Sequence, residues 1–141
     1  MADEKLVEML RRSVEEFNAY RDVHREKPDL HEADLSGLNL DGVNLFDAVL
    51  EAANLRKTSL REANLMGTSL PLADLRDADL TNAELDGAFV GEALFIDANL
   101  TGVQMRNVEG LDQANFDQAI LEPKAQRVIL AAIAESFRDP K

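Results

Sequence analysis

The sequence predicts an all-β solenoid, in which the chain winds into coils that stack on one another, and three observations support it. Every fifth residue from Leu30 to Met105 is apolar and nearly always leucine. The residue two places before each of these is small or apolar in every repeat, most often alanine. The residue two places after is often Gly, Asn or Asp and is never β-branched. A fixed period of this kind is the mark of a repeat architecture.

The five-residue period excludes a helix and fits a chain that turns a corner in every repeat. In a helix, five residues rotate the chain by about 140°, so the leucines would not share a face. In extended chain, the alanine and leucine positions point the same way and the residue between them points outward. Gly, Asn and Asp then supply the turn conformations at the corner. Repeated corners close the chain into coils whose backbone groups pair with the coils above and below.

The segment before the repeats predicts a helix over residues 4–26. Its apolar residues form one stripe, and Pro28 prevents the helix from continuing. The stripe consists of Leu6, Met9, Leu10, Val14, Phe17 and Tyr20. We expect it to pack on the open end of the coil stack, and a helix that binds a partner is the alternative.

The repeat itself reads A-[DN]-L-x-x, and this motif resembles the pentapeptide-repeat family. Unmodified copies are Ala33-Asp34-Leu35, Ala53-Asn54-Leu55, Ala63-Asn64-Leu65, Ala73-Asp74-Leu75, Ala78-Asp79-Leu80 and Ala98-Asn99-Leu100. The resemblance covers roughly residues 28–121. It implies a right-handed quadrilateral β-helix of four to five coils, each made of four repeats, but it assigns no function.

The period slips after Met105 and resumes one residue late at Leu111, which places an insertion or bulge at residues 107–110. Pro123 then begins a predicted helix over residues 123–138, whose apolar side includes Val128, Ile129 and Ile133. Terminal repeats need a cap over their last core layer. The expected organisation is therefore an N-terminal helix in 1–27, a β-helix in 28–121 and a capping or dimerisation helix in 122–141.

Composition excludes several classes of function. The chain has no cysteine, which removes disulfides, thiolate metal sites and thiol catalysis. It has no apolar run long enough for a membrane span and no signal-peptide core, so we expect a cytoplasmic protein. The only two histidines, His24 and His31, have no Ser or Cys arrangement beside them. We therefore expect no enzyme activity, no cofactor, no metal site and no small-molecule substrate.

The charge of the chain is concentrated in the repeats. Residues 28–121 hold 17 Asp and Glu against 5 Lys and Arg, within a net charge of −12 for the whole chain. This excess keeps an extended β surface soluble and disfavours direct nucleic-acid binding, because phosphates would be repelled. The family resemblance adds another hypothesis, an acidic DNA mimic that acts on DNA gyrase or another DNA-binding protein.

Large apolar residues occupy positions that should point outward. The candidate interface consists of Val49, Leu72, Phe89, Leu94 and Ile96, and Phe46 and Met66 break the pattern in the same way. With four sides to a coil, the first three share one side and the next two lie around its corner. Exposed apolar patches often mark interfaces. We expect Phe89, Leu94 and Ile96 to be buried, either beneath a flanking helix, in a homodimer or against another protein. The sequence thus predicts a non-catalytic interaction scaffold.

Overall fold

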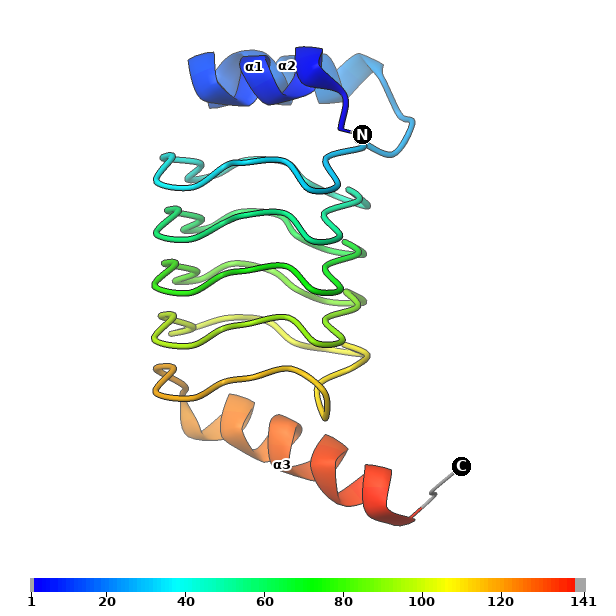
Figure 1. The fold of residues 1–141 in the computed structure, drawn as a ribbon, viewed down its shortest axis with the longest axis vertical. Helices are drawn as coiled ribbons and strands as arrows, with labels where there is room; N and C mark the ends of the chain where they lie inside the picture. Colours follow the sequence, from blue (N-terminus) through cyan, green and yellow to red (C-terminus); the bar gives the residue numbers. More distant parts are fainter. Residues whose placement is uncertain (1, 139–141) are drawn as a thin grey trace.

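The computed structural model describes residues 2–138, and residues 1 and 139–141, at the ends of the predicted terminal segments, lie outside the described part. The chain forms a rod of stacked coils (Figure 1). Helices α1 (Glu4–Arg12) and α2 (Val14–Val23) lie over one end of the stack, and α3 (Pro123–Arg138) lies beneath the other. None of the described helices is both long enough and apolar enough to cross a membrane.

The coils pair in parallel with a constant register. Bridges join Asp29 to Val49, Val49 to Ser69 and Ser69 to Phe89, so each coil takes 20 residues, or four repeats. Extended segments are so short that each contributes a single bridged residue, the outward one between the alanine and leucine positions. Hydrogen bonds run both ways between coils. Leu55 N–H, for example, donates to Asp74 O at 2.8 Å, and Asn54 N–H donates to Ala33 O at 2.9 Å.

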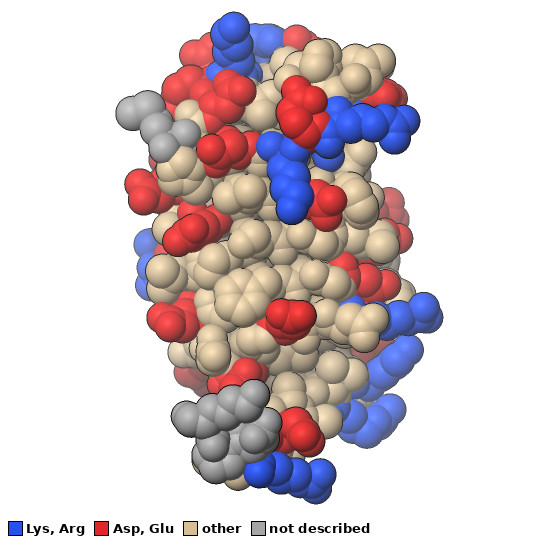
Figure 2. Space-filling view, turned by 90° about the vertical axis from the view of Figure 1, so that its right-hand side faces the viewer, with Lys and Arg blue, Asp and Glu red and all other residues tan. Residues whose placement is uncertain are grey.

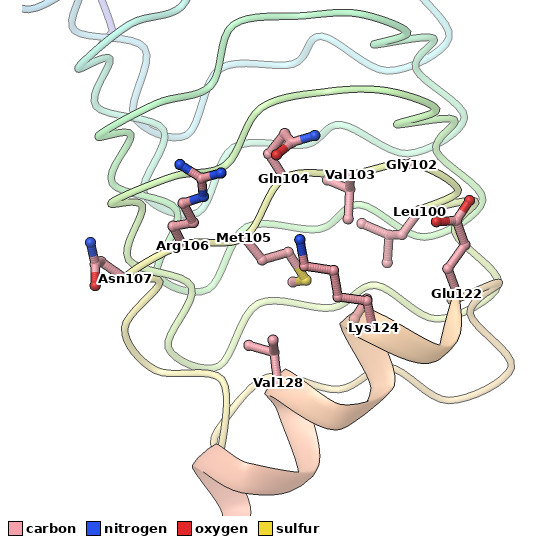
Figure 3. A pocket seen from close by; sticks show the side chains of 11 residues that line it. Leu100, Gly102, Val103, Gln104, Met105, Arg106, Asn107, Glu122, Lys124 and Val128 are labelled. Atoms are coloured by element: carbon pink, nitrogen blue, oxygen red, sulfur yellow. The ribbon is translucent and has the colours of Figure 1, made fainter.

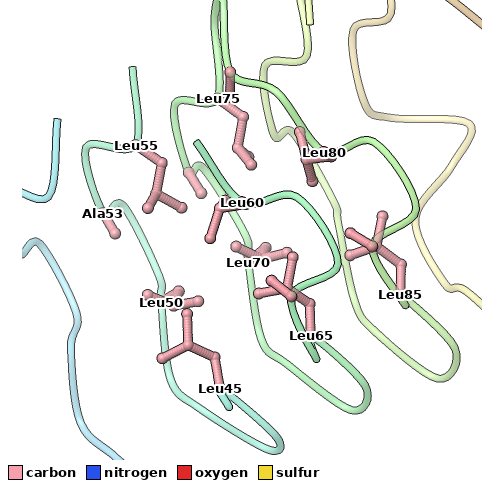
Figure 4. Close-up of a cluster of buried hydrophobic side chains, with 14 of the residues drawn as sticks. Leu45, Leu50, Ala53, Leu55, Leu60, Leu65, Leu70, Leu75, Leu80 and Leu85 are labelled. Atoms are coloured by element: carbon pink, nitrogen blue, oxygen red, sulfur yellow. The ribbon is translucent and has the colours of Figure 1, made fainter. Parts of the chain in front are cut away.

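The leucine and alanine columns form the core. Side chains such as Leu45, Leu60 and Leu75 point into the coils and meet those of the coils above and below (Figure 4). The leucine column is completely buried from Leu30 to Leu85, as predicted. Two threonines in the alanine column are also buried, and each satisfies its hydroxyl locally: Thr58 donates to Leu35 O and Thr68 donates to Leu65 O.

From Leu30 to Met105, every corner uses a left-handed residue two places after the leucine position. This holds even for side chains that rarely adopt it, such as Ala52 (φ 56°) and Leu72 (φ 62°). The turn closes with a hydrogen bond back to the leucine carbonyl, as from Ala53 N–H to Leu50 O at 3.0 Å. The Asn or Asp before the leucine supports the turn from outside, since Asn54 Oδ1 accepts from Arg56 N–H at 3.1 Å.

The single helix predicted over residues 4–26 is wrong, because the segment forms two helices. Ser13 lies between them in extended conformation (φ −164°, ψ 119°) and caps α2, with its side chain accepting from Glu16 N–H. A serine at the N-cap of a helix accepts a hydrogen bond from one of the first backbone N–H groups, which have no partner within the helix. The predicted stripe nevertheless packs on the first coil, with Leu6, Leu10 and Phe17 buried.

The two N-terminal helices also replace the hydrogen-bond partners that a preceding coil would supply. Asp3 N–H donates to Asp29 O at 2.9 Å, and Arg11 Nη2 donates to Asp34 O at 2.9 Å. Asn18 accepts from Asn44 N–H at 2.8 Å and donates to Gly42 O at 3.0 Å. An open strand edge invites association, and these contacts close part of it at this end.

The extra residue lies at the end of the predicted segment or shortly after it. Glu109 still pairs with Phe89 in the 20-residue register, whereas Asn115 pairs with Leu94, 21 residues away. The insertion therefore falls between Glu109 and Asn115, a stretch that overlaps the predicted residues 107–110 at Gly110. Gly110 O accepts from the N–H groups of both Gln113 and Ala114, which makes a longer turn. A β-carbon on Gly110 would lie 2.6 Å from Gly91 N, so the two backbones meet where only glycine fits.

Helix α3 spans the residues that the sequence predicts, and it packs against the last coil. It buries Ala125 and Ile129, while Leu130 and Phe137 remain exposed. A side-chain hydrogen bond joins it to the chain just before it, from Gln126 Nε2 to Leu121 O at 3.0 Å. The described part of α3 thus covers the last core layer without pairing with the coil edge as α1 and α2 do.

Candidate interaction surface

One side of the rod carries an apolar column, which we call the Phe89 side. Its outward residues are joined by bridges from coil to coil: Asp29, Val49, Ser69, Phe89 and Glu109. Val49 is half-buried, and Phe89 keeps 38% of its surface exposed. Between the acidic ends of the column, Val49 and Phe89 flank Ser69, at the position where the other sides carry mostly Asn, Asp and Ser.

Leu72 lies at the corner that follows this side and keeps 54% of its surface exposed. Its N–H donates to Gly91 O at 3.1 Å, which places the corner directly above Gly91. A β-carbon on Gly91 would lie 2.6 Å from Phe89 Cζ. The glycine therefore gives the Phe89 ring room to lie over the lower corner, and the sequence prediction that Leu72 and Phe89 belong to one surface agrees with this geometry.

Phe46 and Met66 extend the surface at the opposite corner, the one that precedes the Phe89 side. They occupy the same position in successive coils, and Asp47 N–H, beside Phe46, donates to Met66 O at 2.9 Å. Phe46 is 43% exposed and Met66 is half-buried. Both residues break the outward polar pattern of the sequence, but the predicted interface does not include them. The 20-residue register was the signal that could have placed them beside Val49.

Leu94 and Ile96 lie around the corner on the next side, as expected, and both are half-buried. Leu94 lies directly below Asp74 in a bridged column. Asp74 accepts two hydrogen bonds from the guanidinium of Arg76, at 2.9 and 2.7 Å. These bonds lower the pKa of the Asp74 carboxyl below its ordinary value. A fixed ion pair therefore borders the apolar residues on this side.

Of the alternatives for burial, cover by a flanking helix is wrong for Phe89. The described helices lie at the two ends of the rod, and none runs along its length (Figure 1). Phe89 and Leu72 are accordingly open to solvent in the single chain. Burial against a second molecule, whether a homodimer or a foreign protein, remains the untested part of the prediction.

Acidic residues border the Phe89 side at its corners: Asp47, Glu51, Asp86 and Glu92. On the long face in Figure 2, acidic side chains are likewise scattered around an uncharged area, and basic side chains gather toward the ends. An apolar centre with a polar rim is the usual anatomy of a protein interface.

The two histidines lie near the junction of the helices with the first coil. His31 Nδ1 lies 2.7 Å from Asp29 Oδ1, and this hydrogen bond lowers the pKa of the Asp29 carboxyl. The His24 ring stacks on Tyr20 with centroids 3.9 Å apart. Across residues 2–138, no group of three or more His, Cys, Asp or Glu is placed to hold a metal ion.

Comparison with known proteins places the chain in a family. A family model for pentapeptide repeats, in eight copies, matches residues 44–80 and 73–109. No curated protein matches the sequence. Among solved structures, a pentapeptide repeat protein from Nostoc PCC 7120 is 31% identical, covering 86% of this chain and 96% of that one, with a TM-score of 0.34.

Two further solved structures are similar to the chain over three quarters of its length. A pentapeptide repeat protein from the thylakoid lumen of Arabidopsis thaliana is 27% identical over 75% of this chain and 69% of that one, with a TM-score of 0.40. QnrB1, a plasmid-mediated fluoroquinolone resistance protein, is 16% identical over 77% and 64%, with a TM-score of 0.34. On the repeat match and the Nostoc identity, the chain belongs to the pentapeptide-repeat family, whose members form right-handed β-helices.

Proposed function

We propose that this protein is a non-catalytic interaction scaffold that binds a protein, either a partner or a second copy of itself, through the Phe89 side. The observation that carries the proposal is the exposure of three large apolar side chains, Phe46, Leu72 and Phe89, at positions that elsewhere carry polar groups. Pentapeptide-repeat proteins are generally non-enzymatic scaffolds, which agrees with this assignment.

The proposal takes the repeats as the right-handed quadrilateral β-helix of the family, with four corners to each 20-residue coil. Such a rod has long, rigid sides, so binding a partner does not require the backbone to lose further conformational entropy. Fully covering one large apolar side chain contributes about 1.5–3 kcal/mol. Left uncovered, the same residues are an association hazard on an extended β surface. The acidic corners favour a partner whose contact surface is apolar in the centre and basic at its margin.

The test is a double variant, Phe89→Asp with Leu94→Asp. Light scattering measures mass, thermal melting measures stability, and a pull-down from native lysate compares captured partners. Ile120→Asp is the matched control, because Ile120 is an exposed apolar residue at the equivalent position on another side. We expect the double variant to lose self-association or partner capture at an unchanged melting temperature. If mass and captured partners match those of the wild type, the proposal is wrong.

The charge distribution supports a second candidate function, an acidic DNA mimic. Residues 28–121 carry 17 acidic against 5 basic side chains, so the excess negative charge lies on the rod. Arg56, Lys57 and Arg61 interrupt this charge, which makes mimicry the weaker proposal. If it holds, the purified protein inhibits supercoiling by DNA gyrase, and added salt weakens the inhibition. Absence of inhibition at micromolar protein rejects it for gyrase.

A further inference from the structure

The last coil leaves a strand edge open above α3. In each inner coil, the residue at the leucine position and the one two places later donate their N–H groups to the coil below, as Leu85 does to Gln104 O and Gly87 to Arg106 O, both at 2.8 Å. Met105 and Asn107 occupy these positions in the last coil. Within the described residues, neither N–H has a hydrogen-bond partner, and Val103 O also lacks the donor that its equivalent Ala83 O receives from Gln104.

A groove of about 560 Å³ runs between this edge and α3. Val103 and Met105 line it on the coil side, and Ala125 and Val128 line it on the helix side (Figure 3). This volume falls in the range of ligand pockets. The groove therefore combines an apolar lining with two backbone donors and one acceptor in strand register, which are the elements of peptide binding by strand addition.

The charges at the groove favour an acidic occupant. Arg106 and Lys124 line it, and among residues 2–138 neither side chain makes an ion pair. Glu122 also lines the groove but lies toward the other end from Arg106 (Figure 3). In the coil above, the residue stacked on Arg106 is Asp86, whose Oδ1 accepts from Arg106 N–H at 2.8 Å. A strand added below would place its equivalent residue in register with Arg106.

We propose that this groove binds an extended peptide segment of another protein, with acidic side chains, as an added strand along Val103–Asn107. The backbone of one peptide residue donates to Val103 O and accepts from Met105 N–H, and the carbonyl two residues later accepts from Asn107 N–H. This is the pattern by which residues 103–107 pair beneath residues 83–87. Acidic side chains on the peptide then face Arg106 and Lys124.

A second copy of the chain is a poorer occupant. Its N-terminal end is partly closed, because α1 and α2 hydrogen-bond to Asp34 O and Asn44 N–H of the first coil. Two C-terminal ends brought face to face would place Arg106 and Lys124 of one copy near the same cations of the other. Like charges in apposition oppose such a contact. A separate extended segment meets neither obstacle.

The probe is a fluorescent, end-blocked peptide that copies residues 81–87, which contain Glu84 and Asp86. Anisotropy of this peptide measures its binding to the full chain. We expect saturable binding that added salt weakens. N-methylation of the peptide residue copied from Glu84 removes the donor to Val103 O, and we expect it to weaken binding about tenfold. This comparison leaves the protein unchanged, so it does not depend on how any variant folds.

The protein variant is Arg106→Glu with Lys124→Glu, and we expect it to weaken binding about fivefold. Its matched control is Lys27→Glu with Lys57→Glu, which makes the same charge change at exposed residues away from the groove and leaves binding unaltered. The Phe89→Asp variant binds the peptide normally, so failure of this proposal is separate from failure of the scaffold proposal.

Three outcomes would overturn the inference. The first is no saturable binding at about 100 micromolar protein. The second is equal affinity for the methylated and unmethylated peptides. The third is that light scattering shows a dimer and that the peptide binds only after this dimer dissociates. A second copy of the chain would then be the occupant of the groove.

Discussion

The inner leucines contact leucines of the coils above and below, so removing one side chain leaves a cavity that rigid neighbours cannot fill. Leu60 and Leu65 are completely buried. We expect Leu60→Ala or Leu65→Ala to lower the free energy of unfolding by roughly 2–5 kcal/mol. Urea titration measures this change. Leu72→Ala is the control, because Leu72 is mostly exposed, and a loss below about 1 kcal/mol at Leu60 would contradict its burial.

Asp74 gives a prediction about pH. Hydrogen bonds from the Arg76 side chain, and then from its backbone N–H, lower the pKa of Asp74 from an ordinary value of 3.8, against the opposing effect of desolvation. A lowered pKa in the folded state stabilises the protein above the ordinary value, and this stabilisation is lost as pH falls through the folded value. We expect Asp74→Asn to cost about 0.5–1 kcal/mol near neutral pH.

The amide introduced by Asp74→Asn would keep an acceptor for Arg76 N–H, as Asn54 does for Arg56 N–H in the coil above. The substitution therefore keeps the backbone hydrogen bond and removes the charge together with one of the two guanidinium hydrogen bonds. The difference in free energy of unfolding between wild type and Asp74→Asn should shrink as the pH falls below 3.8. A difference that stays constant from neutral pH to strong acid would show that the ion pair with Arg76 makes no contribution.

At single positions, the sequence predicted the inside of the rod well and the outside less well. Leu55 and Ala53 are both buried, as the five-residue period of the leucine and alanine positions predicts. The polar residue between them, Asn54, was expected only to point outward, yet it also supports the corner through Arg56 N–H. Hydrogen bonds of this kind leave no trace in the pattern of apolar residues, so that pattern could not predict them. Phe46 was likewise recognisable as unusual, but its neighbours are 20 residues away and depend on the register.

Among the elements, the predicted breaks were the least accurate. An apolar stripe continues past Ser13, and only the capping bond to Glu16 N–H ends one helix and begins the next. The break in the five-residue period after Met105 is another place where the sequence alone does not locate a structural boundary. Periodicity shows that one residue is added, but its position depends on the close approach of Gly110 to Gly91, which lies in another coil.

Asn18 and Arg21 are the α2 residues whose side chains hydrogen-bond to the first coil. The Asn18 side chain accepts from Asn44 N–H and donates to Gly42 O, so Asn18→Ala leaves both groups at the coil edge without a partner. We expect a loss of about 1–3 kcal/mol in the free energy of unfolding. Amide exchange of Asn44 should accelerate as well. Glu15→Ala, at an exposed position of the same helix, is the control.

If the Asn44 amide exchanges at the same rate in Asn18→Ala and in the wild type, the hydrogen bond is not what protects the first coil. A loss of stability equal to that of Glu15→Ala would lead to the same conclusion. The packing of Phe17 and Leu10, with the hydrogen bonds of Asp3 and Arg11, would then account for the contribution of the N-terminal segment.

On the scale of the whole molecule, the rod has two different ends. In a stack of repeats each coil contacts only its neighbours, so stability is set locally and unfolding can begin at either end. The first coil hydrogen-bonds to Asp3, Arg11 and Asn18. The last coil contacts α3 mainly through apolar packing of Ala125 and Ile129, and its edge at Met105 and Asn107 is open within the described chain.

This asymmetry predicts that the native rod opens from its C-terminal end. Equivalent backbone donors allow a direct comparison, because Asn44, Asn54 and Asn115 each donate at the outward position, at 2.8–2.9 Å. Local opening controls the exchange of such amides under native conditions. We expect Asn115 to exchange fastest and Asn54 slowest, with Asn44 nearer to Asn54. Hydrogen exchange followed by NMR measures all three in one sample. Faster exchange at Asn44 than at Asn115 would mean that the hydrogen bonds of α1 and α2 hold the first coil less firmly than the packing of α3 holds the last, and that the open edge at Met105 is not the weak point of the stack.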